Sequence, residues 1–218
     1  ELLTFNRATP GAILTRNAIP RLYSPARQPA SDDLIGFDFR PGDGLLYGVS
    51  QQGGIYTINP VTGLGSFVAD LHDSGSSVTK LPAGTEFGVS FNPVDNTLRL
   101  VSNTTTNWTA DLSGTVTVQP TLHRGSGASA TAARLTAAAH SNDLPAASKT
   151  TIYGIDTSSG ASAVLATVHP TNGTVTNVGS LGVAPADGNI GVALAGRSGE
   201  RRGGKECRSR WSPYHYPK

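Results

Sequence analysis

Cysteine and methionine are almost absent from this 218-residue sequence. The single cysteine, Cys207, lies near the carboxyl end, and there is no methionine. Residues 1–196 therefore can form neither a disulfide framework nor a cysteine-based zinc or redox site. No apolar run approaches the roughly 18 residues that a membrane-spanning helix needs, so no membrane span is expected.

Charged residues are also scarce, at 15% of the chain. The formal net charge of +2 arises at the carboxyl end, because residues 1–196 hold ten basic and thirteen acidic side chains. Residues 1–196 are thus mildly acidic and offer no basic patch for the phosphate backbone of a nucleic acid, so nucleic acid is not an expected partner. Glycine is plentiful, and short apolar runs alternate with turn residues, which indicates an all-β protein.

Four stretches of the sequence open alike, each with an apolar residue followed by small residues. They start near Ile35, Phe87, Leu135 and Ile190, at spacings of 52, 48 and 55 residues. A period of about 50 residues suits the four-stranded blade of a β-propeller and is too long for a leucine-rich or ankyrin repeat. We therefore predict an all-β fold, a β-propeller of four-stranded blades.

Alternation and turn residues place four strands in each complete unit. The predicted strands are Ile35–Phe39, Leu45–Ser50, Ile55–Asn59 and Ser66–Ala69, then Phe87–Phe91, Thr97–Ser102, Asn107–Ala110 and Thr115–Val118, then Leu135–Ala139, Thr151–Asp156, Ala163–Val168 and Thr174–Val178. Leu2–Asn6 and Ile13–Thr15, with a turn at 8–11, look like the end of an earlier unit, and Ile190–Ala195 looks like the start of a later one. The count suggests about five blades, incomplete at both ends, in one repeat domain over residues 1–195.

The first strand of each unit alternates in side-chain size. Ile35, Phe37 and Phe39 share one face of their strand, and Gly36 and Asp38 share the other. We expect the large apolar set to pack between neighbouring units. In a propeller the first strand lines the axis, so Gly36 and its counterpart Gly88 are expected to allow close backbone packing there.

Two residues are the candidates for ligand binding, Asp38 and His140. Asp38 is expected to face the axis, where the competing interpretation is a carboxylate at a water-filled funnel mouth. For His140 the competing interpretation is a solvated histidine at a strand end. Asp95 and Arg99 are four residues apart around a hairpin and are expected to form a structural ion pair.

The last part of the chain departs from every pattern above. Residues 197–218 resemble a conceptual translation of a sequencing-library adaptor, and the alternative is a native basic tail for anionic surfaces. We expect residues 196–218 to be a non-native or disordered tail. Cys207 and His215 are therefore not interpreted as a nucleophile or a ligand.

Five stretches of the sequence carry a resemblance: Ile35–Pro41, Leu45–Val49, Ile55–Gly63, Phe87–Ser102 and Thr151–Asp156. Together they resemble a bacterial family, domain of unknown function 4394. The resemblance covers essentially residues 1–195 and implies a propeller-like, usually exported domain with no established activity. It implies no catalytic or binding residues. We accordingly expect a secreted or cell-envelope protein whose signal peptide is not present in this fragment.

The leading functional hypothesis is a non-catalytic extracellular scaffold or ligand-recognition propeller, with an extracellular or cell-surface ligand. The alternative is a propeller-type hydrolase or lactonase with a metal in the central funnel. Asp38, Ser90, Ala138 and Ala193 are expected at equivalent positions of the first strands, which is a poor set of metal ligands. No catalytic residue, metal ligand or cofactor is predicted, and a structural calcium ion stays open as an alternative.

Overall fold

The computed structural model describes residues 1–6, 8–25, 32–80, 82–104, 106–160, 162–184, 191, 192 and 194. The described chain is all-β, with one short 3-10 helix, η2 (Gly127–Ser129), and several small sheets. In this part of the chain no helix is long and apolar enough to cross a membrane. Of the predicted strand at Ile190–Ala195 only residues 191, 192 and 194 are described, and none of these three is assigned to a strand, while the tail at 196–218 lies outside the described residues.

The strands follow one another with short turns between them. Their bounds are β1 Leu2–Asn6, β2 Thr9–Asn17, β3 Leu34–Phe39, β4 Leu46–Ser50, β5 Gly54–Ile58, β6 Gly65–Asp70, β7 His72–Asp73, β8 Phe87–Phe91, β9 Leu98–Ser102, β10 Asn107–Ala110, β11 Thr115–Val118, β12 His123–Arg124, β13 Thr131–Ala132, β14 Leu135–His140, β15 Ile152–Asp156, β16 Val164–Val168 and β17 Val175–Ser180.

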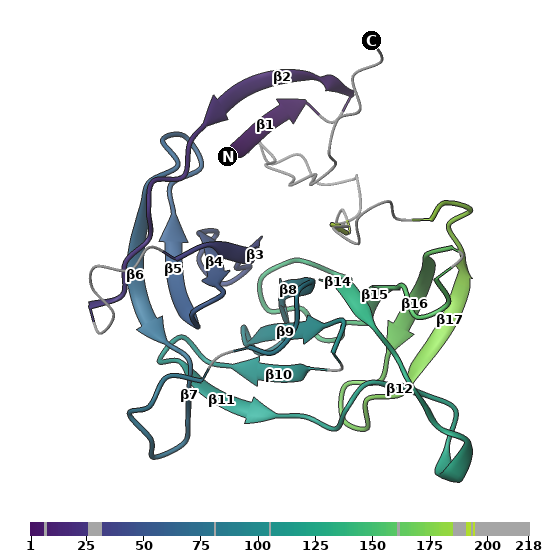
Figure 1. Ribbon diagram of the computed structural model, residues 1–218. Coiled ribbons are helices and arrows are strands. Elements are labelled where there is room, and N and C mark those ends of the chain that lie inside the picture. The colour runs from purple at the N-terminus through teal and green to yellow at the C-terminus, as the bar shows by residue number, and fades with distance from the viewer. Residues whose placement is uncertain are drawn as a thin grey trace.

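Three sheets share the same antiparallel strand order. They are β3-β4-β5-β6, β8-β9-β10-β11 and β14-β15-β16-β17, and β7 adds to the outer edge of the second. All twelve strands predicted for these units are confirmed to within two residues at each end. Figure 1 shows β3, β8 and β14 nearest the middle of the molecule, with β6, β11 and β17 farthest from it.

The amino-terminal hairpin is longer than expected. β1 matches its predicted bounds, but β2 runs from Thr9 to Asn17, so the predicted turn at 8–11 lies partly within a strand. Two register shifts near Phe5 let the strand absorb these turn residues. β7, β12 and β13 were not predicted. Each has only two residues, which is too short for an alternating pattern to show in the sequence.

The third unit is offset by one residue from the expected alignment. Asp38 pairs with Tyr47, whereas Tyr153, which stands in the matching Tyr-Gly pair of β15, is paired with Ala139. The counterpart of Asp38 in β14 is therefore Ala139, and the expected equivalence with Ala138 is wrong. Ser90, paired with Arg99 in β9, is at the corresponding position of β8.

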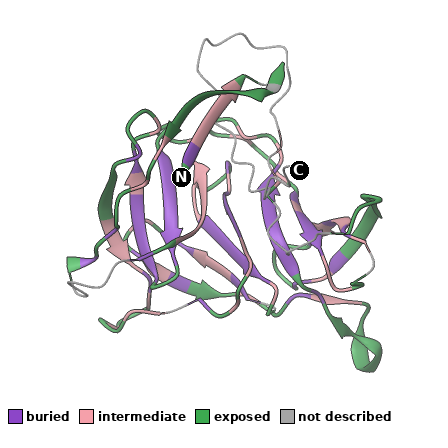
Figure 2. Ribbon diagram, turned by 45° about the horizontal axis from the view of Figure 1, so that its top comes forward, coloured by how far each residue is buried: buried purple, intermediate pink, exposed green. Residues whose placement is uncertain are grey.

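Apolar side chains pack between neighbouring sheets, as the alternation predicts. Val89 and Phe91 of β8 share a core cluster with Tyr47 and Val49 of the preceding sheet. Phe37 and Phe39 pack against Leu2 in another cluster, but Ile35 packs against the first one. The expectation that Ile35 shares a face with Phe37 is wrong because a register shift between Leu34 and Gly36 reverses the side-chain direction. Figure 2 shows exposed residues mainly on outer strands and loops, and buried residues along other strands of the sheets.

A short segment after each outer strand ties one sheet to the next. The His72 N–H donates to the Gly114 carbonyl at 2.8 Å, and the His123 N–H donates to the Gly173 carbonyl at 3.0 Å. Leu71 and Leu122, directly before these histidines, are both 1% exposed, and each is buried in a core cluster with strands of the following sheet. We call Leu71–His72 and Leu122–His123 the straps.

Candidate functional site

Asp38 makes a polar connection between the two innermost strands β3 and β8. Its Oδ2 accepts a hydrogen bond from the Phe91 N–H at 2.8 Å, and its Oδ1 accepts one from the Phe39 N–H at 2.9 Å. The carboxylate therefore points across to the neighbouring strand. Asp38 is only half-buried, so the competing interpretation of a carboxylate at a water-filled funnel mouth stays a prediction.

Ser90 and His140 make the equivalent connection between β8 and β14. Ser90 Oγ and His140 Nδ1 lie 2.8 Å apart in a hydrogen bond, and the two residues are 1% and 4% exposed. The interpretation of His140 as a solvated strand-end histidine is therefore wrong. β14 extends one residue beyond its predicted end, so His140 is part of the strand and is buried there.

Burial shifts the protonation of both candidate residues. Removal from water raises the pKa of Asp38 to about 7, with the nearby Asp143 carboxyl adding to the rise and the N–H groups of Phe91 and Phe39 opposing it. Burial also raises the pKa of Asp143. For His140, burial first and the Arg99 guanidinium second lower the pKa to about 4, against the attraction of Asp95. At neutral pH the His140 ring is thus uncharged.

The Asp38→Asn variant tests this shift through stability. Because the folded pKa of about 7 exceeds the usual 3.8, the native state holds the proton more tightly than the unfolded chain does. The stability that the protonated carboxyl confers is complete below about pH 4 and is lost as the pH rises to about 7. We expect the parent to lose up to about 4 kcal/mol relative to Asp38→Asn across this window, and less to the extent that water reaches the half-buried carboxyl.

Urea unfolding of both proteins at several pH values between 4 and 7.5 measures the difference. The comparison reports the titration of the Asp38 carboxyl together with its interaction with the nearby Asp143 carboxyl. A difference in unfolding free energy that does not change with pH would contradict the shifted titration.

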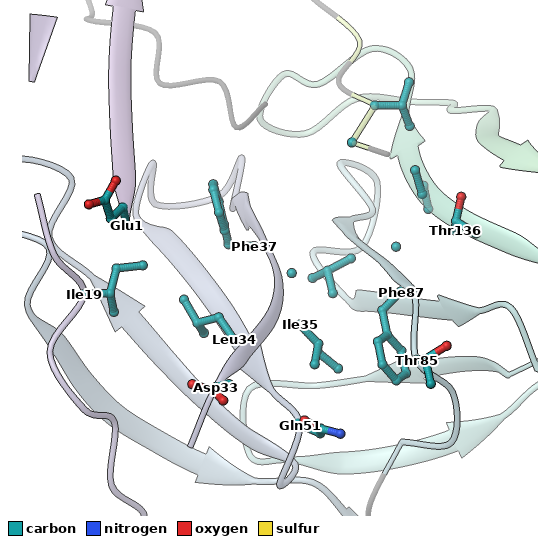
Figure 3. A pocket seen from close by; sticks show the side chains of 17 residues that line it. Glu1, Ile19, Asp33, Leu34, Ile35, Phe37, Gln51, Thr85, Phe87 and Thr136 are labelled. Carbon is teal, nitrogen blue, oxygen red and sulfur yellow. The ribbon is translucent and has the colours of Figure 1, made fainter. Parts of the chain in front are cut away.

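A cavity of about 250 Å³ lies among the three innermost strands. Apolar side chains of β3 and β8 form much of its wall, among them Ile35, Phe37 and Phe87, as Figure 3 shows. Thr136 of β14 also lines it, and its buried Oγ1 has no hydrogen-bond partner among the described residues. The cavity therefore combines an apolar wall with polar side chains, which are Glu1, Asp33, Gln51, Thr85 and Thr136.

The structure separates the two candidate residues from this cavity. Neither Asp38 nor His140 lines it, whereas Thr136, which the sequence analysis did not single out, does. Threonine in an otherwise apolar inner strand was the only available signal. Asp95 and Arg99 do not form the expected ion pair: Asp95 Oδ1 accepts hydrogen bonds from Thr97, and Arg99 donates to Asn107.

The described residues bring no metal-binding group together. No three His, Cys, Asp or Glu side chains among them gather closely enough to hold an ion. Ser90 and His140 are a hydroxyl–imidazole pair of the kind used in nucleophilic catalysis, but Ser90 is 1% exposed and does not line the cavity. The pair instead joins β8 to β14.

Comparison with known proteins identifies a family for the chain. Residues 1–203 match the family described as "Domain of unknown function (DUF4394)". The searches of curated proteins and of solved structures gave no match. The match covers nearly the whole sequence and agrees with the resemblance carried by its Phe-Gly and Tyr-Gly strands, so the chain belongs to the DUF4394 family.

Proposed function

We propose that the three four-stranded sheets are blades of a β-propeller that has about five blades, as the sequence period predicts. Two observations support this. The sheets have the same strand order, and their first strands contact one another in sequence, β3 with β8 and β8 with β14. Each strap also donates a hydrogen bond to a glycine carbonyl just before the outer strand of the following sheet, which is the connection expected between successive blades.

We propose further that the domain recognises a ligand and does not transform one. The observation that supports this is the central cavity, where side chains of three different strands converge on one space. Such pockets are mostly apolar with a few polar groups that orient the ligand, and Thr136 provides one here. The favoured ligand is a small, largely apolar molecule with one or more hydrogen-bonding groups, met outside the cell or at the cell envelope.

Indole is a suitable probe, since it is small and apolar and has a single N–H donor. We expect saturation-transfer NMR to detect indole binding to the parent protein. The Ile35→Trp variant should lose at least tenfold in indole affinity, because the larger side chain occupies part of the cavity.

Ile13→Trp is the matched control, since Ile13 is an exposed residue of β2. This variant should bind indole as the parent does. Equal binding by the Ile35→Trp variant would place the indole elsewhere and overturn the assignment of the cavity.

A further inference from the structure

Arg99 is a buried arginine without a carboxylate partner. The residue is 5% exposed, and within the described ranges no acidic oxygen forms an ion pair with it. Its Nη1 donates to Asn107 Oδ1 at 2.5 Å, and its buried Nε has no hydrogen-bond partner. Burial accordingly lowers the pKa of Arg99, although the group stays charged.

Another arginine of the same region shows the usual arrangement. Arg124 of β12 places its Nη2 2.6 Å from Asp156 Oδ2, so the buried carboxylate and the guanidinium compensate each other. A guanidinium withdrawn from water without such a partner is strongly destabilising. Arg99 therefore lacks a counter-charge that its chemistry calls for.

The guanidinium borders a polar groove of about 450 Å³ between the second and third sheets. Hydroxyl and amide side chains form much of the groove wall, together with His169: Asn92, Thr150, Thr151, Thr167, Asn172, Thr174 and Thr176. Ile152, Val168 and Pro170 add apolar surface. The groove shares no lining residue with the central cavity, so the two are separate sites.

The charges near the groove favour an anion. The uncharged His140 ring lines the groove beside Arg99 and adds no competing charge. Asp95, whose attraction partly offsets the burial of Arg99, is exposed and already accepts hydrogen bonds from Thr97 through its Oδ1. The planar guanidinium matches a carboxylate, and Arg99 lines the groove.

We propose that this groove binds a sugar acid, with the ligand carboxylate on the Arg99 guanidinium and the ligand hydroxyls on the threonine and asparagine side chains. The carboxylate provides the missing counter-charge. The threonine-rich wall suits a polyhydroxylated molecule, and the three apolar residues suit its C–H faces. This inference does not depend on the proposed role of the central cavity.

Isothermal titration calorimetry with glucuronate and glucose tests the proposal at neutral pH and low salt. Glucuronate should bind the parent at least tenfold more tightly than glucose, which has the same hydroxyl pattern without the carboxylate. Arg99→Gln should weaken glucuronate binding at least tenfold, the effect of losing one charge-assisted hydrogen bond. Arg134→Gln, the same charge change at an exposed residue, should leave the affinity unchanged.

Arg99→Lys keeps the positive charge and removes the planar guanidinium. It therefore tests the contact between Arg99 and the ligand carboxylate if Arg99→Gln fails to fold. It should bind glucuronate at least threefold more weakly than the parent. Three results would each overturn the proposal: no glucuronate binding by the parent, equal affinities for glucuronate and glucose, or full glucuronate affinity in a folded Arg99 variant.

Discussion

The Gly88→Ala variant is expected to lose about 3 kcal/mol of stability or more, or to fail to fold. A Cβ atom at Gly88 would lie 2.3 Å from the Ala138 N atom and 2.5 Å from the Ala137 carbonyl carbon. Both atoms belong to the backbone of β14, so no side-chain rotation can relieve the overlap. The variant must separate the innermost strands β8 and β14, which loosens the Ser90–His140 hydrogen bond as well.

Gly179→Ala is the matched control. Gly179 also lies in a strand, β17, but nothing stands within 4 Å of the position a Cβ would take. This variant should change the free energy of unfolding by no more than about 0.5 kcal/mol. Urea unfolding followed by circular dichroism compares the two, and equal stability of both variants would show that β8 and β14 do not approach so closely.

The Leu71→Ala variant is expected to lose about 2–5 kcal/mol of stability. Leu71 belongs to a strap, and its side chain is packed in the cluster that also contains Phe91, Leu98 and Val116 of the second sheet. Truncation of Leu71 leaves a cavity where the strap packs against the second sheet. The adjacent pairing between β7 and β11 should weaken as a result.

Leu64→Ala provides the comparison, because Leu64 is 57% exposed in the turn before β6. Its loss of stability should stay within about 0.5 kcal/mol. Chemical denaturation measures both variants, and hydrogen exchange at the amides of β11 reports on the strap. Unchanged protection of β11 in the Leu71→Ala variant would contradict the proposed role of the strap in holding this strand.

The strands could be predicted from the sequence because they depend on local patterns. β10 and β11 match their predicted bounds, and the Asp111–Gly114 turn between them combines an aspartate that accepts hydrogen bonds from its own turn with a glycine at φ +93. Turn residues of this kind act within four positions of the chain, so the sequence shows them directly.

The register and the polar contacts could not be predicted in the same way. The bulge that turns Ile35 away from Phe37 leaves no local signal, and it reverses the face on which Ile35 packs. Asp38 binds the N–H of Phe91, 53 positions along the chain, and Ser90 meets His140 across 50. Such contacts arise only when separate sheets come together, so the candidate site differed from the expectation more than the strands did.

The straps also fix where one structural module ends. Leu71–His72 bonds to the second sheet and Leu122–His123 bonds to the third. Each strap therefore belongs to the module of the sheet that follows it, and not to the module of the outer strand that precedes it. Gene duplication or laboratory shuffling of these modules should therefore succeed when the crossover precedes Leu71 and Leu122, so that each sheet travels together with the segment that seals its core.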